Sequence, residues 1–515
     1  MMDRGLRALT IAALGSAALV PAPARSAEDP ALAKIETVVV IYAENRSFDN
    51  LYGNFPGANG LQNVTPDAAR QLDRDGSVLK ELPPAWGGLT APGVKPAITE
   101  AQSAHLPNAP FAIDDPKGFN QPLTVTTRDL WHKFYQNQMQ IDQGKNDRFA
   151  AWADSGGLVM GHYDDASKLP LWKIAQRYVL ADNFFMGAFG GSFLNHQMLA
   201  CACVPYYANA DQSPAKSQIS AIDPDGVTLT VAADSPKSAL DHPPKFVNDG
   251  TLTPDFYAIN TMQPPYQPSS VAPAADGDKR FADPTKNNVL VPQTVPTIGD
   301  LLSQKGVTWA WYSGAWQWTL DGHDSSPLPN FQFHHQPFNY FAAYAPGTPA
   351  REEHLKDGGL WGSEFLKDID AGKLPRVAFY KPQGNLNEHA GYTDVFSGDE
   401  HIADLIAHLE RSPQWPHMVV ILTYDENGGF WDHAAPPKAD RWGPGNRIPA
   451  MIISPFAKKG TVDHTLYDTT SILRFITRRF DLPLLAGIKA RDEAMAAAGS
   501  GHLGDLTGAL DLAAP

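Results

Sequence analysis

The feature that most constrains the fold is Met418–Tyr424, a largely apolar run that leads directly into Asp425 and Glu426. A continuous apolar run of this length, ended by glycines, is typical of a strand buried on both faces of a parallel sheet. Ligands of such sheets collect at the carboxyl ends of the strands. Two adjacent carboxylates repel each other there unless a cation or hydrogen-bond donors compensate them. The pattern therefore predicts a functional site after this strand, with a turn that carries two solvated acids as the alternative.

A second strand of the same kind, 35–42, is followed by Glu44 and Asn45. Further apolar runs alternate with amphipathic stretches along the chain, which is typical of a parallel sheet covered by helices on both faces. We therefore predict an α/β fold with a mostly parallel sheet flanked by helices. The predicted strands are 35–42, 307–312, 376–380, 418–424 and 448–454, and the predicted helices are 129–147, 171–180, 297–305, 362–372, 397–410 and 468–480.

The composition changes between residues 204 and 289, where Pro and Asp are frequent and apolar runs are short. Within this segment, 226–232 alternates like an edge strand. We interpret 204–289 as a β-rich insertion or lid within a catalytic core formed by 28–203 and 290–485. The Ala- and Gly-rich segment 486–515 is predicted to be peripheral.

Residues 1–27 have the pattern of a signal peptide, because Arg4 and Arg7 precede the apolar run Ala8–Val20 and small residues follow it. The run is too short for a confident membrane span, and no later apolar segment is longer. We expect export to a periplasm or to the exterior, without stable membrane insertion. A retained anchor is the alternative.

The net charge limits the kinds of partner, and the two cysteines limit the possible disulfides. The formal net charge is −15 and the pI is near 5.5, which argues against a nucleic-acid partner, since such surfaces need a basic patch. A local metal ion could still attract an anionic substrate. A bridge between Cys201 and Cys203 would close a tight loop, so the sequence leaves open whether these cysteines are bridged in an oxidising compartment.

Hard oxygen ligands follow two strands that are distant in sequence: Glu44 and Asn45 after one, Asp425 and Glu426 after the other. Because the ends of parallel strands converge, we expect these side chains to lie together. Oxygen-rich ligation with a few histidines suits a divalent cation such as Zn²⁺, Mg²⁺, Mn²⁺ or Ca²⁺. A lone histidine, by contrast, is more often a hydrogen-bonded structural residue than a ligand.

Ser192 follows Gly190 and Gly191, which permit close approach of the backbone to a ligand and leave the hydroxyl uncovered. The stretch is not Gly-x-Ser-x-Gly, so it does not indicate an α/β-hydrolase elbow. A serine hydroxyl is a weak nucleophile at neutral pH unless a base or a metal ion activates it. With carboxylates expected nearby, we predict that Ser192 is a metal-activated nucleophile; an ordinary Gly-rich turn is the alternative.

Together these stretches resemble the bacterial phosphoesterase family, which unites phosphatidylcholine-type phospholipases C with secreted, respiratory-burst-inhibiting acid phosphatases. The resemblance extends from about residue 35 to residue 485. It implies an alkaline-phosphatase-like core and a metal-assisted mechanism through a phosphoserine. The motifs that carry it are Glu44-Asn45-Arg46-Ser47-Phe48-Asp49, Gly190-Gly191-Ser192-(x)2-Asn195-His196 and Tyr424-Asp425-Glu426-Asn427-Gly428-Gly429-(x)2-Asp432-His433.

The resemblance also implies residue roles. Ser192 would attack phosphorus. The residues that would hold the cation are Glu44, Asn45, Asp425 and Glu426. The imidazoles that would surround the phosphate, as donors or as a general acid, are His132, His334, His335 and His389. His433 matches a motif, but the sequence does not decide whether it binds the metal or orients Asp425.

Within the family, the chain resembles the acid phosphatases more than the phospholipases, because of Ser192, the stretch that begins at His132 and the His334-His335 pair. The first hypothesis is a secreted, metal-dependent acid phosphatase that acts on small phosphate monoesters. One alternative is a phospholipase C that binds a phospholipid headgroup and cleaves phosphatidylcholine-like phosphodiesters. Another is a non-catalytic binding protein on the same scaffold.

Overall fold

The computed structural model describes residues 30–513 of the chain. The predicted signal peptide, 1–27, lies outside these residues. Within the described part, no helix combines the length and the apolar character needed to cross a membrane.

One eight-stranded sheet forms the centre of the molecule. In spatial order its strands are β11 (Thr461–Asp463), β4 (Val179–Ala181), β10 (Ala450–Ile453), β9 (Met418–Tyr424), β1 (Thr37–Ala43), β8 (Val377–Lys381), β6 (Trp309–Gly314) and β7 (Leu355–Gly359). Neighbouring strands are parallel except at β10, which runs against both β4 and β9. The predicted α/β class with a mostly parallel sheet is therefore confirmed. Two small parallel pairs lie outside this sheet, β5 (Phe184–Phe185) with β12 (Tyr467–Asp468) and β2 (Phe111–Ala112) with β3 (Gly161–His162).

The strands β1 and β9 lie side by side at the centre, and every residue of both is buried. Their apolar, β-branched side chains fill the two faces of the sheet, as the unbroken apolar runs predict. The two strands are in register from Thr37 opposite Met418 to Ala43 opposite Tyr424, so they end at the same level. The residues that follow them therefore emerge next to each other.

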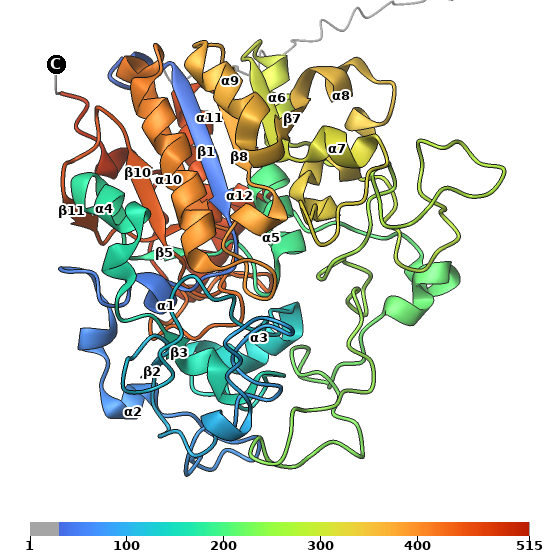
Figure 1. Cartoon of the computed structure of the whole chain (residues 1–515). Helices are drawn as coiled ribbons and strands as arrows, with labels where there is room; N and C mark the ends of the chain where they lie inside the picture. The colour runs from blue at the N-terminus through green and yellow to red at the C-terminus, as the bar shows by residue number, and fades with distance from the viewer. Residues whose placement is uncertain (1–29, 514–515) are drawn as a thin grey trace, which may run out of the picture.

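Helices cover the sheet on both faces. The helices are α1 (Phe48–Tyr52), α2 (Pro66–Ala69), α3 (Phe134–Ile141), α4 (Pro170–Arg177), α5 (Ser192–Cys201), α6 (Ile298–Gln304), α7 (Trp316–Leu320), α8 (Pro349–His354), α9 (Ser363–Asp370), α10 (Val395–Arg411), α11 (Thr469–Arg479) and α12 (Ala486–Ala498). The helices α4, α9 and α10 pack together, while α5 packs with α6 and α11. In Figure 1, α9 and α10 lie in front of the strands, and β1 runs down toward the loop-rich half of the molecule.

Two predicted helices are shorter in the structure. The range 129–147 contains only α3 and a following 3-10 turn, so His132 lies in the segment before the helix. The range 171–180 ends its helix at Arg177, because the apolar residues Val179–Ala181 pair with β10 as strand β4. Pairing with a strand that is distant in sequence overrides local propensity here. Ser192 lies at the first position of α5, directly after the Gly-rich stretch.

The segment 204–289 differs from the predicted β-rich lid. All of its residues are described, and they form isolated β-bridges, such as Ile222–Leu229 and Val231–Phe246, and short 3-10 helices, but no strand. The predicted edge strand 226–232 therefore makes only single bridges. Pro224 and Gly226 turn the chain at the start of this stretch, and neither residue supports a continuous ladder.

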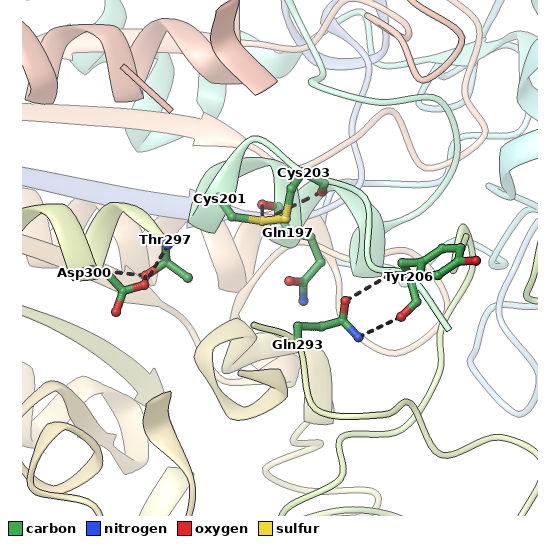
Figure 2. Close-up of a disulfide and its surroundings, with 7 residues drawn as sticks. All are labelled: Gln197, Cys201, Cys203, Tyr206, Gln293, Thr297 and Asp300. Atoms are coloured by element: carbon green, nitrogen blue, oxygen red, sulfur yellow. Dashed lines mark hydrogen bonds between the residues drawn. A yellow bond between two sulfur atoms is a disulfide. The ribbon is translucent and has the colours of Figure 1, made fainter. Parts of the chain in front are cut away.

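The insertion leaves and rejoins the core beside the end of α5. Cys201 and Cys203 form a disulfide there, with their Cα atoms 5.1 Å apart (Figure 2). Gln293 joins the two ends, because its Oε1 accepts from the Tyr206 amide at 2.9 Å and its Nε2 donates to the Tyr206 carbonyl at 3.1 Å. Thr297 begins α6 with a capping box only a few residues later. The stem of the insertion is therefore fixed between two helices of the core.

The segment 486–515 is less peripheral than predicted, because it contains α12. Arg491 on this helix is only 2% exposed and donates to Asp468 at 2.8 Å and to Asp440 at 2.6 Å. It also donates to the Gly187 carbonyl at 2.9 Å. Because Gly187 lies in the loop that leads to Ser192, this hydrogen bond attaches α12 to that loop.

Asp399 on α10 links this helix to α4. Its Oδ1 accepts from the Leu171 amide at 2.9 Å, and its Oδ2 is buried without a hydrogen-bond partner. Burial raises the pKa of Asp399 from 3.8 to about 8. A folded-state pKa above the unfolded value means that the bound proton stabilises the fold at low pH and that this stabilisation is lost as the pH rises through about 8.

The first prediction is that Asp399→Asn removes this pH dependence, because the amide keeps the acceptor for Leu171 and carries no charge. The thermal midpoints of the variant and of the parent protein are followed by circular dichroism. The midpoint of the variant should rise relative to that of the parent as the pH rises from about 4 to about 8. Above that range the difference should stay constant. Thermal midpoints that change with pH in the same way in both proteins would contradict the assignment.

Candidate active site

The predicted oxygen ligands lie together at the ends of β1 and β9. Glu44 and Asn45 follow β1, while Asp425 and Glu426 follow β9. The Asn45 amide donates to Asp425 Oδ1 at 3.1 Å, and all of these side chains are fully buried. The level ends of the two strands thus bring together the residues that the sequence predicted to converge.

The turns after the two strands approach each other very closely. A Cβ on Gly428 would lie 2.3 Å from the Asn45 carbonyl oxygen, so only glycine permits this approach. Gly428 also has a φ of 61°, in the left-handed region that glycine adopts without strain. Its amide donates to Glu426 Oε2 at 2.6 Å, which fixes the direction of that carboxylate.

Ser192 faces these strand ends from the first position of α5. Its Oγ lies 3.2 Å from Asn45 Oδ1 and 3.2 Å from Glu426 Oε1, so its single proton can point to either oxygen. The free amides and the dipole at the N-terminus of a helix favour negative charge at such a position. The Ser192 hydroxyl therefore lies between the predicted oxygen ligands and the N-terminus of α5, which suits an anionic ester.

Basic and polar groups hold both oxygens of Glu44. Lys381 Nζ lies 2.8 Å from Oε1 and His335 Nε2 lies 2.5 Å from the same oxygen, while Asn387 and Tyr392 each donate to Oε2 at 2.8 Å. Burial by itself would raise the pKa of Glu44, but His335 and Lys381 outweigh burial and hold this pKa well below its ordinary value. Glu44 is therefore ionised at neutral pH.

Asp425 and Glu426 have less compensation of their charge by neighbouring groups than Glu44 has. Burial raises the pKa of Asp425 to about 7, with Lys381 opposing the shift and Glu44 adding to it. Burial and the charge of Asp425 raise the pKa of Glu426 well above its ordinary value. Asp425 Oδ2 is also buried without a hydrogen-bond partner. A divalent cation would compensate these oxygens, so the donor set fits such an ion.

The predicted histidines surround this centre. His335 contacts Glu44, and His334 stands beside it in the 3-10 helix Phe333–His335. His132 Nε2 lies 3.8 Å from Glu426 Oε1, and the rings of His132 and His389 meet edge to face with centroids 5.4 Å apart. Burial lowers the pKa of His334 well below its ordinary value, lowers that of His335 to about 4 and also lowers that of His389. These three imidazoles are therefore neutral at neutral pH.

The sequence analysis missed two buried side chains of the site, His196 and Lys381. His196 Nδ1 donates to the Ser192 carbonyl at 2.7 Å, and its Nε2 is buried without a hydrogen-bond partner. One potential ligand atom from each of His196, Glu44 and Asp425 lies within 4.8 Å of the others. Signals for both were present, because His196 is four residues after Ser192 on one helix face and Lys381 ends an apolar strand, where a charge needs a partner.

His433 lies in a different cluster. Its Nδ1 is 2.6 Å from Asp49 Oδ2, and Arg447 lies 2.9 Å from Asp49 and 3.0 Å from Asp432. Because the guanidinium already compensates these acids, the cluster is an ion-pair network. His433 therefore holds Asp49 and does not orient Asp425, which answers the question that the sequence left open.

A cavity of about 460 Å³ opens over Ser192. Core residues His132, His334 and His389 line it, and the insertion contributes residues 249–251 and 260–261. The insertion thus forms one wall of the candidate active site.

With this geometry in view, the sequence can be compared with known proteins. Residues 35–483 match the sequence profile of the Phosphoesterase family. The chain belongs to that family. The motifs around Glu44, Ser192 and Asp425 predicted this family.

The relatives carry the name phospholipase C. Phospholipase C A of Mycobacterium tuberculosis is 23% identical over 518 residues, which cover 94% of this chain and 78% of that protein. Non-hemolytic phospholipase C of Burkholderia pseudomallei is 26% identical over 226 residues, 36% of this chain and only 32% of that protein. Non-specific phospholipase C6 of Arabidopsis thaliana is 30% identical over 151 residues, 23% of this chain and 29% of that protein. None of these three is named an acid phosphatase, so they favour the alternative over the predicted branch.

Solved structures superpose only in part. A protein in the alkaline phosphatase superfamily from Vibrio parahaemolyticus gives a TM-score of 0.32 at 12% identity, over 70% of this chain and 67% of that one. The lipoteichoic acid synthase LtaP from Listeria monocytogenes gives a TM-score of 0.29 at 9% identity, over 66% and 68%. The fold class of this chain rests on its own strand order, and these superpositions carry no argument about its activity.

The second prediction concerns the cation. Asp425→Ala removes a carboxylate from the proposed ligand set, so the purified variant should contain less divalent metal per protein than the parent, by elemental analysis. Asp404→Ala is the matched control, because the Asp404 side chain is 62% exposed on α10 and should leave the metal content unchanged. An unchanged metal content in Asp425→Ala would contradict its role as a ligand.

Proposed function

We propose that this chain hydrolyses phosphodiesters in the manner of a phospholipase C, through a phosphoserine at Ser192. The observation that carries the proposal is the position of Ser192 Oγ, 3.2 Å from both Asn45 Oδ1 and Glu426 Oε1 at the wall of a cavity ringed by histidines. The names of the relatives support the phosphodiester as the substrate class. We also propose that the protein acts in a periplasm or outside the cell.

In the first step, Ser192 Oγ forms a bond to phosphorus while the bond from phosphorus to the leaving oxygen breaks. The hydroxyl proton passes to water in the cavity that Ser192 lines, because Glu426 is itself one of the proposed ligands of the cation. His132, at the cavity wall beside Glu426, is placed to donate a proton to the leaving oxygen. The proposed ligands Glu44, Asn45, Asp425 and Glu426, with His196 as a further candidate, would hold a divalent cation that acts as a Lewis acid on the phosphoryl oxygens.

In the second step, water forms a bond to phosphorus while the bond from phosphorus to Ser192 Oγ breaks, and Oγ regains its proton from water in the cavity. His389 is better suited to accept a proton from that water than to donate one to the phosphate, because its Nδ1 donates to the Ala390 carbonyl. Burial lowers the pKa of His389, so its Nε2 carries a free electron pair at neutral pH. This refines the donor role that the family resemblance implied for His389.

Hydrolysis of phosphate monoesters is the second candidate function. The cavity wall is rich in polar side chains, among them Lys133, Asp249, Asn260 and Gln332. Such a wall suits a small hydrophilic ester better than an acyl chain. The same proposed catalytic residues would serve either substrate.

The deciding experiment, and the third prediction, is a paired assay of the purified protein on p-nitrophenylphosphorylcholine and p-nitrophenyl phosphate, with and without a chelator. We expect faster turnover of the choline diester, and loss of that turnover when metal is removed. Turnover of the monoester alone would replace the phospholipase proposal by the acid phosphatase hypothesis. A protein that hydrolyses neither ester with metal supplied would contradict both.

The fourth prediction concerns the nucleophile. Ser192→Ala should lower kcat on the preferred ester by on the order of 10³-fold or more, because no covalent intermediate can form. The far-UV circular dichroism spectrum and the thermal midpoint should stay close to those of the parent. Ser217→Ala changes an exposed serine of the insertion and serves as the control. A Ser192→Ala variant with near-parental kcat would point to direct attack by water.

A further inference from the structure

The segment 131–136, which leads into and includes the first residues of α3, is the place where the insertion meets the candidate active site. Asp249 of the insertion binds this segment twice, because its Oδ2 accepts from Lys133 Nζ at 2.7 Å and from Gln136 Nε2 at 2.7 Å. The Asp249 side chain is 16% exposed and that of Lys133 is 39% exposed, so the carboxylate is the more buried partner of this ion pair. Truncating one partner of such a pair leaves the other charge partly buried and uncompensated.

Asn260 binds the same segment through the backbone. Its Oδ1 accepts from the Phe134 amide at 3.1 Å, and its Nδ2 donates to the Gly250 carbonyl at 3.0 Å. The Phe134 amide is one of the free donors at the start of α3, so Asn260 acts as a cap supplied by another part of the chain. The amide of Asn260 therefore connects the first turn of α3 to the loop that carries Asp249.

A ring contact extends this attachment to the other side of His132. The rings of Trp131 and Phe246 lie 6.1 Å apart between centroids. The insertion thus holds Trp131 and Lys133, the two neighbours of His132, and the amide of Phe134. Within 131–134, His132 is the residue that the insertion does not hold, and it faces Ser192.

The extended backbone explains this division. Lys133 has φ −110° and ψ 157°, and side chains in an extended segment point alternately to opposite sides. Trp131 and Lys133 face the insertion, so His132 faces the centre, where its Nε2 lies 3.8 Å from Glu426 Oε1.

The loop that carries Ser192 packs against the same segment. A Cβ on Gly190 would lie 2.4 Å from the Phe134 nitrogen, and one on Gly191 would lie 2.7 Å from the His132 carbonyl oxygen. The segment is thus enclosed between the Ser192 loop and the insertion. The stem of the insertion is fixed by Gln293 and lies beside the disulfide, so the cavity wall formed by the insertion is anchored to the core.

We propose that the insertion positions His132 for the reaction, and that Asp249 and Asn260 are the positioning residues. This inference rests on the proposed function for the role of His132, but the attachment itself is independent of it. Removal of either side chain frees the segment 131–136 to shift relative to Ser192. A misplacement of about 1 Å at a reacting group can cost about 10²-fold in rate. The effect should fall more on kcat than on KM, because Asp249 and Asn260 line the cavity but neither is proposed to touch the phosphoryl group.

The test is a double-mutant cycle on the preferred ester. We expect His132→Ala to lower kcat by about 10²-fold and Asn260→Ala to lower it by about tenfold, with KM changed by less than about twofold in Asn260→Ala. In the His132→Ala background, Asn260→Ala should cause no further loss, because residues that act through one another are not additive. Fully additive losses would overturn the proposal, and Asp249→Ala repeats the cycle if Asn260→Ala does not fold.

Hydrogen exchange measured by mass spectrometry provides a second readout, which does not need activity. Exchange in a peptide that covers 131–137 should rise in Asn260→Ala and in Asp249→Ala. The matched control is Asn248→Ala, whose side chain donates to Ile219 and Ser217 within the insertion, and it should leave both that exchange and kcat unchanged. Unchanged exchange in Asn260→Ala and Asp249→Ala would overturn the proposal. Raised exchange in a protein that hydrolyses neither ester would instead contradict the proposed function and support the attachment.

Discussion

The parallel pairing of β1 with β9 is the constraint on which the rest of this structure depends. It makes Glu44 and Asp425 neighbours although they are far apart in sequence, and it lets the two turns pass at a distance that only Gly428 permits. A shift of one strand by one residue would turn the residues that follow it to the opposite face and separate Glu44 from Asp425. The register of the two strands therefore fixes the relative positions of the polar residues.

Placing three carboxylates in one buried region costs free energy, and the protein compensates them unequally. Lys381 and His335 hold Glu44 in its ionised form, whereas burial raises the pKa of Asp425 to about 7 and raises that of Glu426 well above its ordinary value. A wholly structural cluster would be expected to resemble that of Asp49, Asp432 and Arg447, where a guanidinium binds both acids. The incomplete compensation beside Ser192 is what makes this cluster a candidate for binding a cation.

The insertion shows how irregular structure can contribute to a site. It has no strand, yet its stem is fixed and its residues 249–251 and 260–261 form one wall of the cavity. Its contacts are made with the residues on either side of His132, so it can influence chemistry without contacting the phosphoryl group.

The sequence by itself determined the α/β class, the two central strands and the acids that follow them, because unbroken apolar runs and strand-end carboxylates are local patterns. It also placed Ser192 in a recognisable motif, and the family resemblance implied roles for His132, His334, His335 and His389. It did not determine that Val179–Ala181 is a strand, that Lys381 and His196 complete the buried centre, that His433 pairs with Asp49, or that Asp249 and Asn260 hold the segment of His132. Each of these depends on a partner distant along the chain. Only the tertiary structure decided them, because a hydrogen bond or an ion pair is defined by distance in space, and folding alone brings such partners within reach.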